Sequence, residues 1–392
     1  MSLNEVTLNL PNYPMEELAK IRQRLVQAQK KVFDFGTGDP KIPTWEPIRK
    51  AVLETLPSIS QYPSTRGCPE LVTSIWTYLH RHFGITKDSG FDIAASNGSK
   101  EAIFHISLCL VGRAGGKRII GYPDPGYPVY RSSALFAGGV PYPMELKAEN
   151  GFQLEPWLLP EHVQSQMAAL WINYPHNPTG ATMTEAHMDK IIAWCQSRDV
   201  ILLADDCYID IYDPSWDAQG KRPPSPIQKT SHNVFSFMSL SKRSGMTGYR
   251  SGFVVGDAKL MPALHTARAN FGVGTPTMIQ RGAAVAWADE DHVAERRRIF
   301  AKRIDMAFSY LQKLGLIDRK PEATFYLWAR VPQGWEDVDF CLKLAEEGVI
   351  TSPSQWLSEG IKGYFRLALV PDEKDTLEAL EILTRFVQSL KV

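Results

Sequence analysis

Ser239-Leu-Ser-Lys-Arg-Ser-Gly-Met-Thr-Gly-Tyr-Arg-Ser-Gly252 is the most informative stretch of the chain, and it directly follows the apolar run Val234–Met238. Short apolar runs bounded by turn residues fit buried strands, and ligands of α/β sheets usually bind where strands end. The stretch offers hydroxyls and a guanidinium that can hold a phosphate, and a lysine that can form a Schiff base with an aldehyde. A lone lysine is normally a solvated side chain. The hydroxyls, glycines and arginine around Lys242 are what make it a candidate for binding an aldehyde.

The flanking sequence indicates an α/β domain. From about residue 90 to 256, short apolar runs alternate with amphipathic patterns. The candidate strands are 92–95, 118–121, 169–173, 200–204, 234–238 and 252–255. The candidate helices are 100–111, 128–137 and 184–198, the last preceded by a possible capping box at 182–185. Such alternation predicts a mostly parallel sheet covered on both faces.

The pattern changes after about residue 280 and predicts a smaller α+β domain. Phe300, Ile304 and Leu311 share one stripe of a long amphipathic helix. Two strand-like segments, 324–331 and 364–370, follow it, and a final amphipathic helix ends the chain. We expect residues 1–44 and 285–392 to form the small domain, with a large domain of residues 45–284 inserted between them.

Composition narrows the classes of function. The chain has 392 residues, and its 43 basic residues balance 43 acidic ones, which argues against a general nucleic-acid binder. No stretch approaches the roughly 20 apolar residues of a membrane helix, and residues 1–10 lack the features of a secretion signal. The five cysteines are scattered without a CxxC pair, which argues against disulfide or zinc frameworks. We expect a cytoplasmic protein with no metal, nucleic-acid or membrane partner.

The stretch around Lys242 closely resembles the pyridoxal-phosphate attachment pattern of class I/II aminotransferases, which share fold type I. The family pattern has an arginine eight residues after the lysine, and Arg250 stands there; Ser251 replaces the usual small aliphatic residue. The resemblance runs over nearly the whole chain. It implies a mostly parallel seven-stranded sheet in the large domain and pyridoxal 5'-phosphate as the cofactor, bound by Lys242, Arg250, Ser239 and Ser241.

Two motifs at other strand ends match the family. Asn177, in the segment 173–180, matches the asparagine that hydrogen-bonds the cofactor's phenolic oxygen, although Pro/Gly turns with an Asn cap are common. The family pattern Asp-x-x-Tyr implies that Asp205 pairs with the pyridinium nitrogen and that Tyr208 bonds the phenolic oxygen. A protonated ring is the better electron sink. The neighbouring Asp206 could shift the register, and the spacing to Tyr208 favours Asp205.

The phosphate turn and the stacking ring are also implied by the resemblance. Ser99 and Lys100 follow a strand and begin a helix, where exposed N–H groups and the helix dipole favour a phosphate. Tyr127 matches the aromatic residue that lies flat on the pyridine ring. An ordinary strand–helix connection and a buried core tyrosine are the alternatives.

Three further matches concern the substrate and a second subunit. Tyr62 matches a tyrosine that reaches the cofactor phosphate of the other subunit, which implies a homodimer with shared active sites. Gly38 matches a backbone contact to the substrate carboxylate, to which Asn177 also contributes. Arg366 is a lone charge in an apolar strand. The family uses this arginine to hold the substrate α-carboxylate in a bidentate fork, and a structural ion pair is the alternative.

The resemblance implies transamination between an amino acid and a 2-oxo acid, with 2-oxoglutarate as the expected acceptor. Lys242 would move the proton as general base and acid, supported by Asp205 and Tyr208. The segments 239–253 and 325–330 are most similar to succinyldiaminopimelate aminotransferases of bacterial lysine biosynthesis, which implies N-succinyl-LL-diaminopimelate as the donor. Aminotransferases for aspartate, alanine, branched or aromatic amino acids stay open, as does a β-lyase on the same fold. Candidates for the far end of a long substrate are Tyr13, Arg131, Arg243 and Tyr326.

Overall fold

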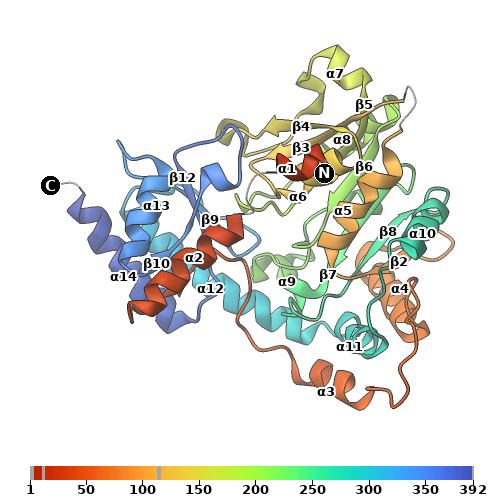
Figure 1. The fold of residues 1–392 in the computed structure, drawn as a ribbon, viewed down its shortest axis with the longest axis horizontal. Coiled ribbons are helices and arrows are strands. Elements are labelled where there is room, and N and C mark those ends of the chain that lie inside the picture. Colours follow the sequence, from red (N-terminus) through yellow and green to blue (C-terminus); the bar gives the residue numbers. More distant parts are fainter. Residues whose placement is uncertain (1–3, 11–13, 113–115, 391–392) are drawn as a thin grey trace.

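A seven-stranded sheet forms the centre of the chain. The computed structural model describes residues 4–10, 14–112 and 116–390. The strands lie in the order β2-β8-β7-β6-β5-β3-β4, and β8 runs antiparallel to its two neighbours while the other pairs are parallel (Figure 1). Their bounds are β2 Phe91–Ser96, β3 Ile119–Asp124, β4 Val140–Glu145, β5 Met167–Ile172, β6 Ile201–Asp205, β7 Val234–Ser239 and β8 Gly252–Asp257. Each of the six expected strands is present.

The seven strands confirm the sheet that the family resemblance implied, but the seventh strand, β4, was not among the candidate strands. It contains Pro141 and Pro143, and a proline cannot donate a hydrogen bond to a neighbouring strand. The structure accommodates both prolines because β4 lies at the edge of the sheet and pairs only with β3.

Helices cover both faces of this sheet, because the strands alternate apolar side chains between them. In β5, Ala169 and Trp171 pack in the core beneath one helix layer, whereas Leu170 and Ile172 pack in the core beneath the other. The first layer contains α5 Ser99–Leu110, α6 Val129–Phe136 and α10 Met261–Asn270, and the second contains α4 Pro69–Phe83, α8 Glu185–Ser197 and α11 Thr277–Ala288.

A smaller unit joins the two ends of the chain. Its antiparallel sheet has the order β11-β12-β9, with β9 Tyr326–Arg330, β11 Ser352–Pro353 and β12 Tyr364–Ala368. A separate pair, β1 Phe33–Asp34 with β10 Val349–Ile350, ties the amino-terminal segment to the carboxyl-terminal one. Helices α2 Pro14–Gln27, α12 Asp291–Lys313, α13 Asp337–Glu346 and α14 Glu373–Ser389 complete it. The expected boundaries at residues 44 and 285 stay a prediction.

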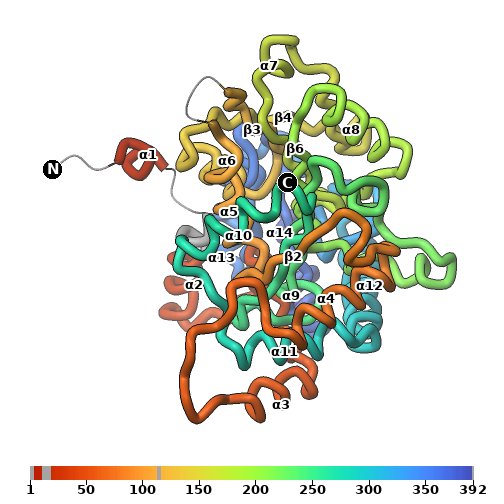
Figure 2. Tube along the Cα trace, turned by 90° about the vertical axis from the view of Figure 1, so that its right-hand side faces the viewer, coloured from red at the N-terminus to blue at the C-terminus, as the bar shows by residue number. Residues whose placement is uncertain are grey.

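Other helices complete the described part of the chain. They include α1 Glu5–Leu8, α3 Glu46–Glu54, α7 Glu161–Ser165 and α9 Leu240–Arg243. Helix α1 lies off to one side of the body in Figure 2 and buries none of its residues. Helix α8 is capped by Thr184, whose side chain accepts a hydrogen bond from His187 N, so the expected cap at Thr182 was placed two residues too early. No helix in the described ranges has the length and apolarity to cross a membrane.

Candidate active site

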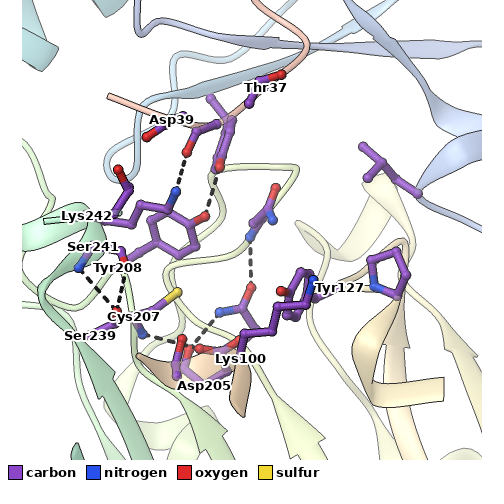
Figure 3. Close-up of a pocket in the computed structure, with 18 of the residues that line it drawn as sticks. Thr37, Asp39, Lys100, Tyr127, Asp205, Cys207, Tyr208, Ser239, Ser241 and Lys242 are labelled. Carbon is purple, nitrogen blue, oxygen red and sulfur yellow. Dashed lines mark hydrogen bonds between the residues drawn. The ribbon is translucent and has the colours of Figure 1, made fainter. Parts of the chain in front are cut away.

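A cavity of about 450 Å³ opens where the large sheet meets the amino-terminal segment and the small sheet. The carboxyl ends of β5, β6 and β7 contribute Asn173, Asp205 and Ser239 to its lining. This agrees with the rule that ligands of open α/β sheets bind beyond the carboxyl ends of the strands. The predicted site residues that line it are Gly38, Ser99, Lys100, Tyr127, Asn177, Asp205, Tyr208, Ser239, Ser241, Lys242, Arg250 and Arg366 (Figure 3).

Lys242 enters the cavity from α9, which begins where β7 ends. Ser239 caps this helix, accepting a hydrogen bond from Ser241 N at 3.2 Å, so the strand–helix junction fixes the direction of the lysine. Its Nζ donates to the Gly38 carbonyl. Loss of hydration lowers the pKa of Lys242 to about 8. At pH 7 roughly one molecule in ten then carries a neutral amine, the form that can attack an aldehyde.

Asp205 lies on the floor of the cavity, at the end of β6, and is buried. Its Oδ2 accepts a hydrogen bond from the Tyr130 hydroxyl at 2.7 Å, and its backbone carbonyl accepts one from Asn173 Nδ2 at 2.7 Å. Burial raises the pKa of Asp205. Among the described residues no cation lies within ion-pairing distance of it, although a buried carboxylate is costly unless a positive charge faces it. A protonated pyridine nitrogen would supply that charge.

The adjacent Asp206 points away from the cavity. Its Oδ2 accepts hydrogen bonds from the Ser225 and Ser236 hydroxyls, both at 2.6 Å. Burial raises the pKa of Asp206 to about 7. The structure therefore places Asp205, and not Asp206, in the cavity, as the spacing to Tyr208 favours.

The amino terminus of α5 forms a cradle suited to a phosphate. Gly98 precedes the helix with φ 77°, and a Cβ there would lie 2.7 Å from Arg250 Nη2. The Arg250 guanidinium donates to the carbonyls of Asn97 at 2.9 Å and Thr247 at 2.7 Å, so it is held beside the helix end. Backbone N–H groups and the helix dipole favour an anion there. The side chains around the cradle are Ser99, Lys100, Ser239, Ser241 and Arg250.

Arg366 reaches the cavity from β12 and is buried. Its Nη1 donates to Asn177 Oδ1 at 2.9 Å and its Nη2 to the Gly36 carbonyl at 2.6 Å, while its guanidinium lies 4.6 Å from the Tyr326 ring centroid. Its Nε has no hydrogen-bond partner within the described part of the chain. No carboxylate of the described residues pairs with it, so the alternative of a structural ion pair finds no support there.

Tyrosines and a glycine surround these charged groups. The Tyr208 hydroxyl lies 2.8 Å from that of Tyr326, and the two rings pack edge to face. A side chain at Gly38 would collide with the Tyr326 hydroxyl, which explains the glycine. Tyr127 lines the cavity and packs edge to face on Tyr130, the residue that bonds Asp205.

Several expected residues lie elsewhere. Tyr62 is fully exposed and does not line the cavity, so its proposed reach into a second subunit stays a prediction. Arg131 pairs with Glu359 at 3.2 Å outside the cavity. Arg243 is wholly buried among carboxylates, so the expectation that it borders the substrate is wrong. Tyr326 does line the cavity, and Tyr13 lies outside the described residues.

The structure also adds residues that the sequence interpretation missed. Cys207 lies inside the Asp-x-x-Tyr motif, and Asp39 directly follows Gly38, so proximity to known motifs could have revealed both. Ser352 hydrogen-bonds the Gly36 carbonyl at 3.0 Å and has no motif that marks it. No group of three or more His, Cys, Asp or Glu side chains suited to a metal occurs in the part of the chain that the structure describes.

Comparison with known proteins decides the family. The model of the family described as aminotransferase class I and II matches residues 30–383. This chain belongs to the class I and II aminotransferases. Members of the family use pyridoxal phosphate, and the lysine, the unpaired carboxylate and the phosphate cradle described above fit that cofactor. The aminotransferase is therefore expected to hold it between α5, α9 and the end of β6.

The relatives of this aminotransferase include enzymes of diaminopimelate metabolism. The LL-diaminopimelate aminotransferase of Aquifex aeolicus is 35% identical over 378 residues, covering 95% of this chain and 96% of that protein. Among solved structures, substrate-bound BacF of Bacillus subtilis has a TM-score of 0.90 at 25% identity and covers 99% of this chain and 98% of that one. A probable N-succinyldiaminopimelate aminotransferase of Thermus thermophilus, with a TM-score of 0.85 and 24% identity over 95% of this chain and 99% of that one, shares the fold.

Proposed function

We propose that this aminotransferase moves the amino group of LL-diaminopimelate to a 2-oxo acid, with 2-oxoglutarate as the acceptor. One observation supports the reaction above all. A single cavity holds a lysine with a depressed pKa, a buried carboxylate without a cation among the described residues, and an arginine with an unbonded Nε. These groups match the proton, the ring nitrogen and the substrate carboxylate that transamination must handle.

Each side chain then has a defined task. Pyridoxal phosphate, when bound, supplies an electron sink for the electrons of the breaking Cα–H bond. Asp205 keeps the ring nitrogen protonated, and Tyr208 and Asn177 donate hydrogen bonds toward the phenolic oxygen. Lys242 takes the proton from Cα of the donor and returns it as general acid.

Substrate orientation falls to Arg366 and its surroundings. The guanidinium is already directed by Asn177, Gly36 and Ser352, so little conformational freedom is lost when a carboxylate binds. Its planar fork matches the two oxygens of an α-carboxylate. Tyr326 packs against the Arg366 guanidinium and would form the side of the cavity next to the donor.

The identity of the donor rests on the relatives. Proteins about one-third identical over nearly the full chain carry the name LL-diaminopimelate aminotransferase. The sequence interpretation favoured the N-succinylated form of the same diamino acid. The two donors differ at the far amino group, which is a cation in one and an amide in the other. A direct comparison of both therefore belongs in the first assay.

We also infer a cytoplasmic homodimer. The end of α3 and the segment that follows it expose a row of large apolar side chains, with 72% of Leu53, 65% of Leu56 and 75% of Ile59 accessible, and Tyr62 follows them. Such a row on one protruding segment is typical of a protein interface. A second copy would cover it and could bring Tyr62 to the neighbouring phosphate cradle.

A donor screen tests the proposed function. Purified protein supplied with pyridoxal phosphate is mixed with 2-oxoglutarate and, in turn, LL-diaminopimelate, N-succinyl-LL-diaminopimelate, aspartate, alanine and an aromatic amino acid, and glutamate formation is measured. We expect the highest kcat/KM with LL-diaminopimelate. A higher value with the succinylated donor would transfer the assignment to that substrate, and 2-oxo acid-independent release of ammonia would indicate a lyase.

A further inference from the structure

Another cavity, of about 320 Å³, is lined by the segment 42–45, by Ser244 and by the start of α12. Its apolar walls come from Ile42, Trp45 and Ile299, and its polar groups include Ser244, His292 and Arg296. None of these residues lines the first cavity. The transamination machinery proposed above does not use them.

Arg296 is the feature that makes this cavity unusual. Only 4% of the residue is exposed, and its Nε and Nη2 have no hydrogen-bond partner among the described residues. It forms no ion pair in the part of the chain that the structure describes. The neighbouring Arg297, by contrast, is bound by Asp217 at 3.0 Å. Burial, reinforced by Arg303, lowers the pKa of Arg296 to about 10, which leaves it charged at pH 7.

Ser244, His292 and Glu295, which also line the cavity, are already engaged. His292 lies 2.5 Å from Asp289 through Nδ1 and 2.8 Å from the Ser244 hydroxyl through Nε2, and its ring stacks on Trp45. Glu295 binds the exposed Arg298 at 3.0 Å. Asp291 also borders the cavity but is exposed and forms no ion pair with Arg296.

The guanidinium itself is held in place without an anion. A Cβ at Gly245 would lie 2.7 Å from Arg296 Nη1, so the glycine permits the guanidinium to lie against the backbone that follows α9. The centroid of the Phe300 ring lies 5.7 Å from the guanidinium carbon of Arg296. A buried charge of this kind is strongly destabilising unless an opposite charge faces it.

We propose that this cavity binds the carboxylate of a small molecule with an apolar body. A guanidinium fork matches the oxygens of a carboxylate, and the isoleucine and tryptophan walls match a hydrocarbon portion. The ligand would lie against Gly245, whose carbonyl accepts a hydrogen bond from the Thr44 hydroxyl at 2.8 Å. It would therefore contact both the loop that follows Lys242 and the segment that follows Asp39.

Binding of hexanoate to the holoenzyme tests this directly. Because Arg366 also binds carboxylates, isothermal titration is done in an Arg366→Met background, where we expect one hexanoate per chain. Adding Arg296→Met should weaken that binding at least roughly tenfold, since a hydrogen-bonded charge is lost. Arg296→Lys should retain part of it, and Arg319→Met, a change on the exposed surface, should leave it unchanged.

Three results would overturn the proposal. They are no hexanoate binding at millimolar concentration, equal binding by the Arg296→Met variant, and binding of inorganic phosphate in place of hexanoate. Thermal unfolding gives an independent check. Without ligand, Arg296→Met should unfold at a higher temperature than the wild type, because it removes an unpaired buried charge. A lower unfolding temperature would mean that Arg296 has an internal partner.

Discussion

Lys242 and Arg243 are neighbours in α9, yet they lie in opposite electrostatic surroundings. Arg243 belongs to a buried ion cluster, which we define as Asp210, Arg222, Arg243 and Glu290. Its Nε lies 3.0 Å from Asp210 and its Nη2 2.7 Å from Glu290, and Arg222 binds the other oxygen of Asp210 at 2.7 Å. Burial would raise the pKa of Asp210, but the two guanidiniums outweigh it and hold the pKa at about 2.

The active-site side of α9 has the opposite character. Lys242, Arg250 and Arg366 form no ion pair within the described residues, and Asp205 faces no cation there. The ion cluster is complete without a ligand, whereas the active site is complete only with a cofactor and a substrate. Incomplete charge pairing, more than the presence of charges, therefore distinguishes the functional side of this helix.

The largest expected effect comes from Lys242→Ala. Transamination should fall by at least roughly 10⁴-fold, the upper end of what a positioned acid–base group contributes. Folding should not suffer, because with a pKa of about 8 the ammonium is mostly charged and desolvated at pH 7. Glutamate formation and urea unfolding of the apoprotein measure the two quantities. If the variant retained a tenth of the activity, Lys242 would not be the group that transfers the proton.

Arg243→Met should give the converse result. Removing one partner of a buried ion pair costs about 3–5 kcal/mol of unfolding free energy, since Asp210 and Glu290 lose a neutralising charge. Urea unfolding measures this loss. The fraction that remains folded should still bind pyridoxal phosphate, seen as visible absorption. A variant as stable as the wild type would show that the ion cluster is not structural.

Arg366→Lys is a milder change among the active-site cations that lack an ion pair in the described residues. The variant keeps the positive charge but loses the planar fork. The KM for the amino donor should rise about 10- to 100-fold, consistent with the loss of roughly 1.5–3 kcal/mol of charge-assisted hydrogen bonding. Cofactor absorption serves as the control and should not change. If the donor KM stayed the same, another group would have to hold the α-carboxylate.

Asp206→Asn should have the smallest effect and a definite pH dependence. The pKa of Asp206 is about 7 in the folded state, against an ordinary value of 3.8, so the folded protein retains a proton that the unfolded chain releases. Wild-type stability therefore falls as pH rises from about 4 to about 7. Asparagine does not titrate. At pH 5 the variant should be less stable than the wild type by about 1 kcal/mol in urea unfolding, the value of one hydrogen bond, and by pH 8 the difference should reverse, because the wild type then holds a buried carboxylate.

The reliable predictions from sequence were those with a local physical signature. Apolar runs located six strands of the large sheet, because buried parallel strands need little else. Asp205 lines the cavity and Asp206 does not, so the spacing to Tyr208 in the family pattern was sufficient to choose between them. Lys242 and Asn177 were placed by the family resemblance of their motifs, and both line the cavity.

The missed features depend on tertiary packing. The strand β4 is tolerated only because it lies at an edge, which no local pattern reveals. Arg243 looks like any cation beside a binding lysine, and only the approach of Asp210 and Glu290 from distant segments makes it structural. Nothing in the sequence indicated that Tyr130 donates a hydrogen bond to Asp205, because that contact requires α6 to lie against the end of β6.

The amino-terminal segment with Gly36 and Gly38, which forms one side of the active-site cavity, has an implication for biosynthesis. The Gly36 carbonyl bonds the Ser352 hydroxyl across 316 residues of chain. At roughly 5–20 residues per second, a ribosome needs about 15–60 s to make that intervening segment. The strands from β2 to β8 can assemble during this interval, before the segment with Gly36 and Gly38 can contact Ser352. Capture of the vitamin-derived cofactor in its final geometry therefore has to wait until Ser352 has been synthesised.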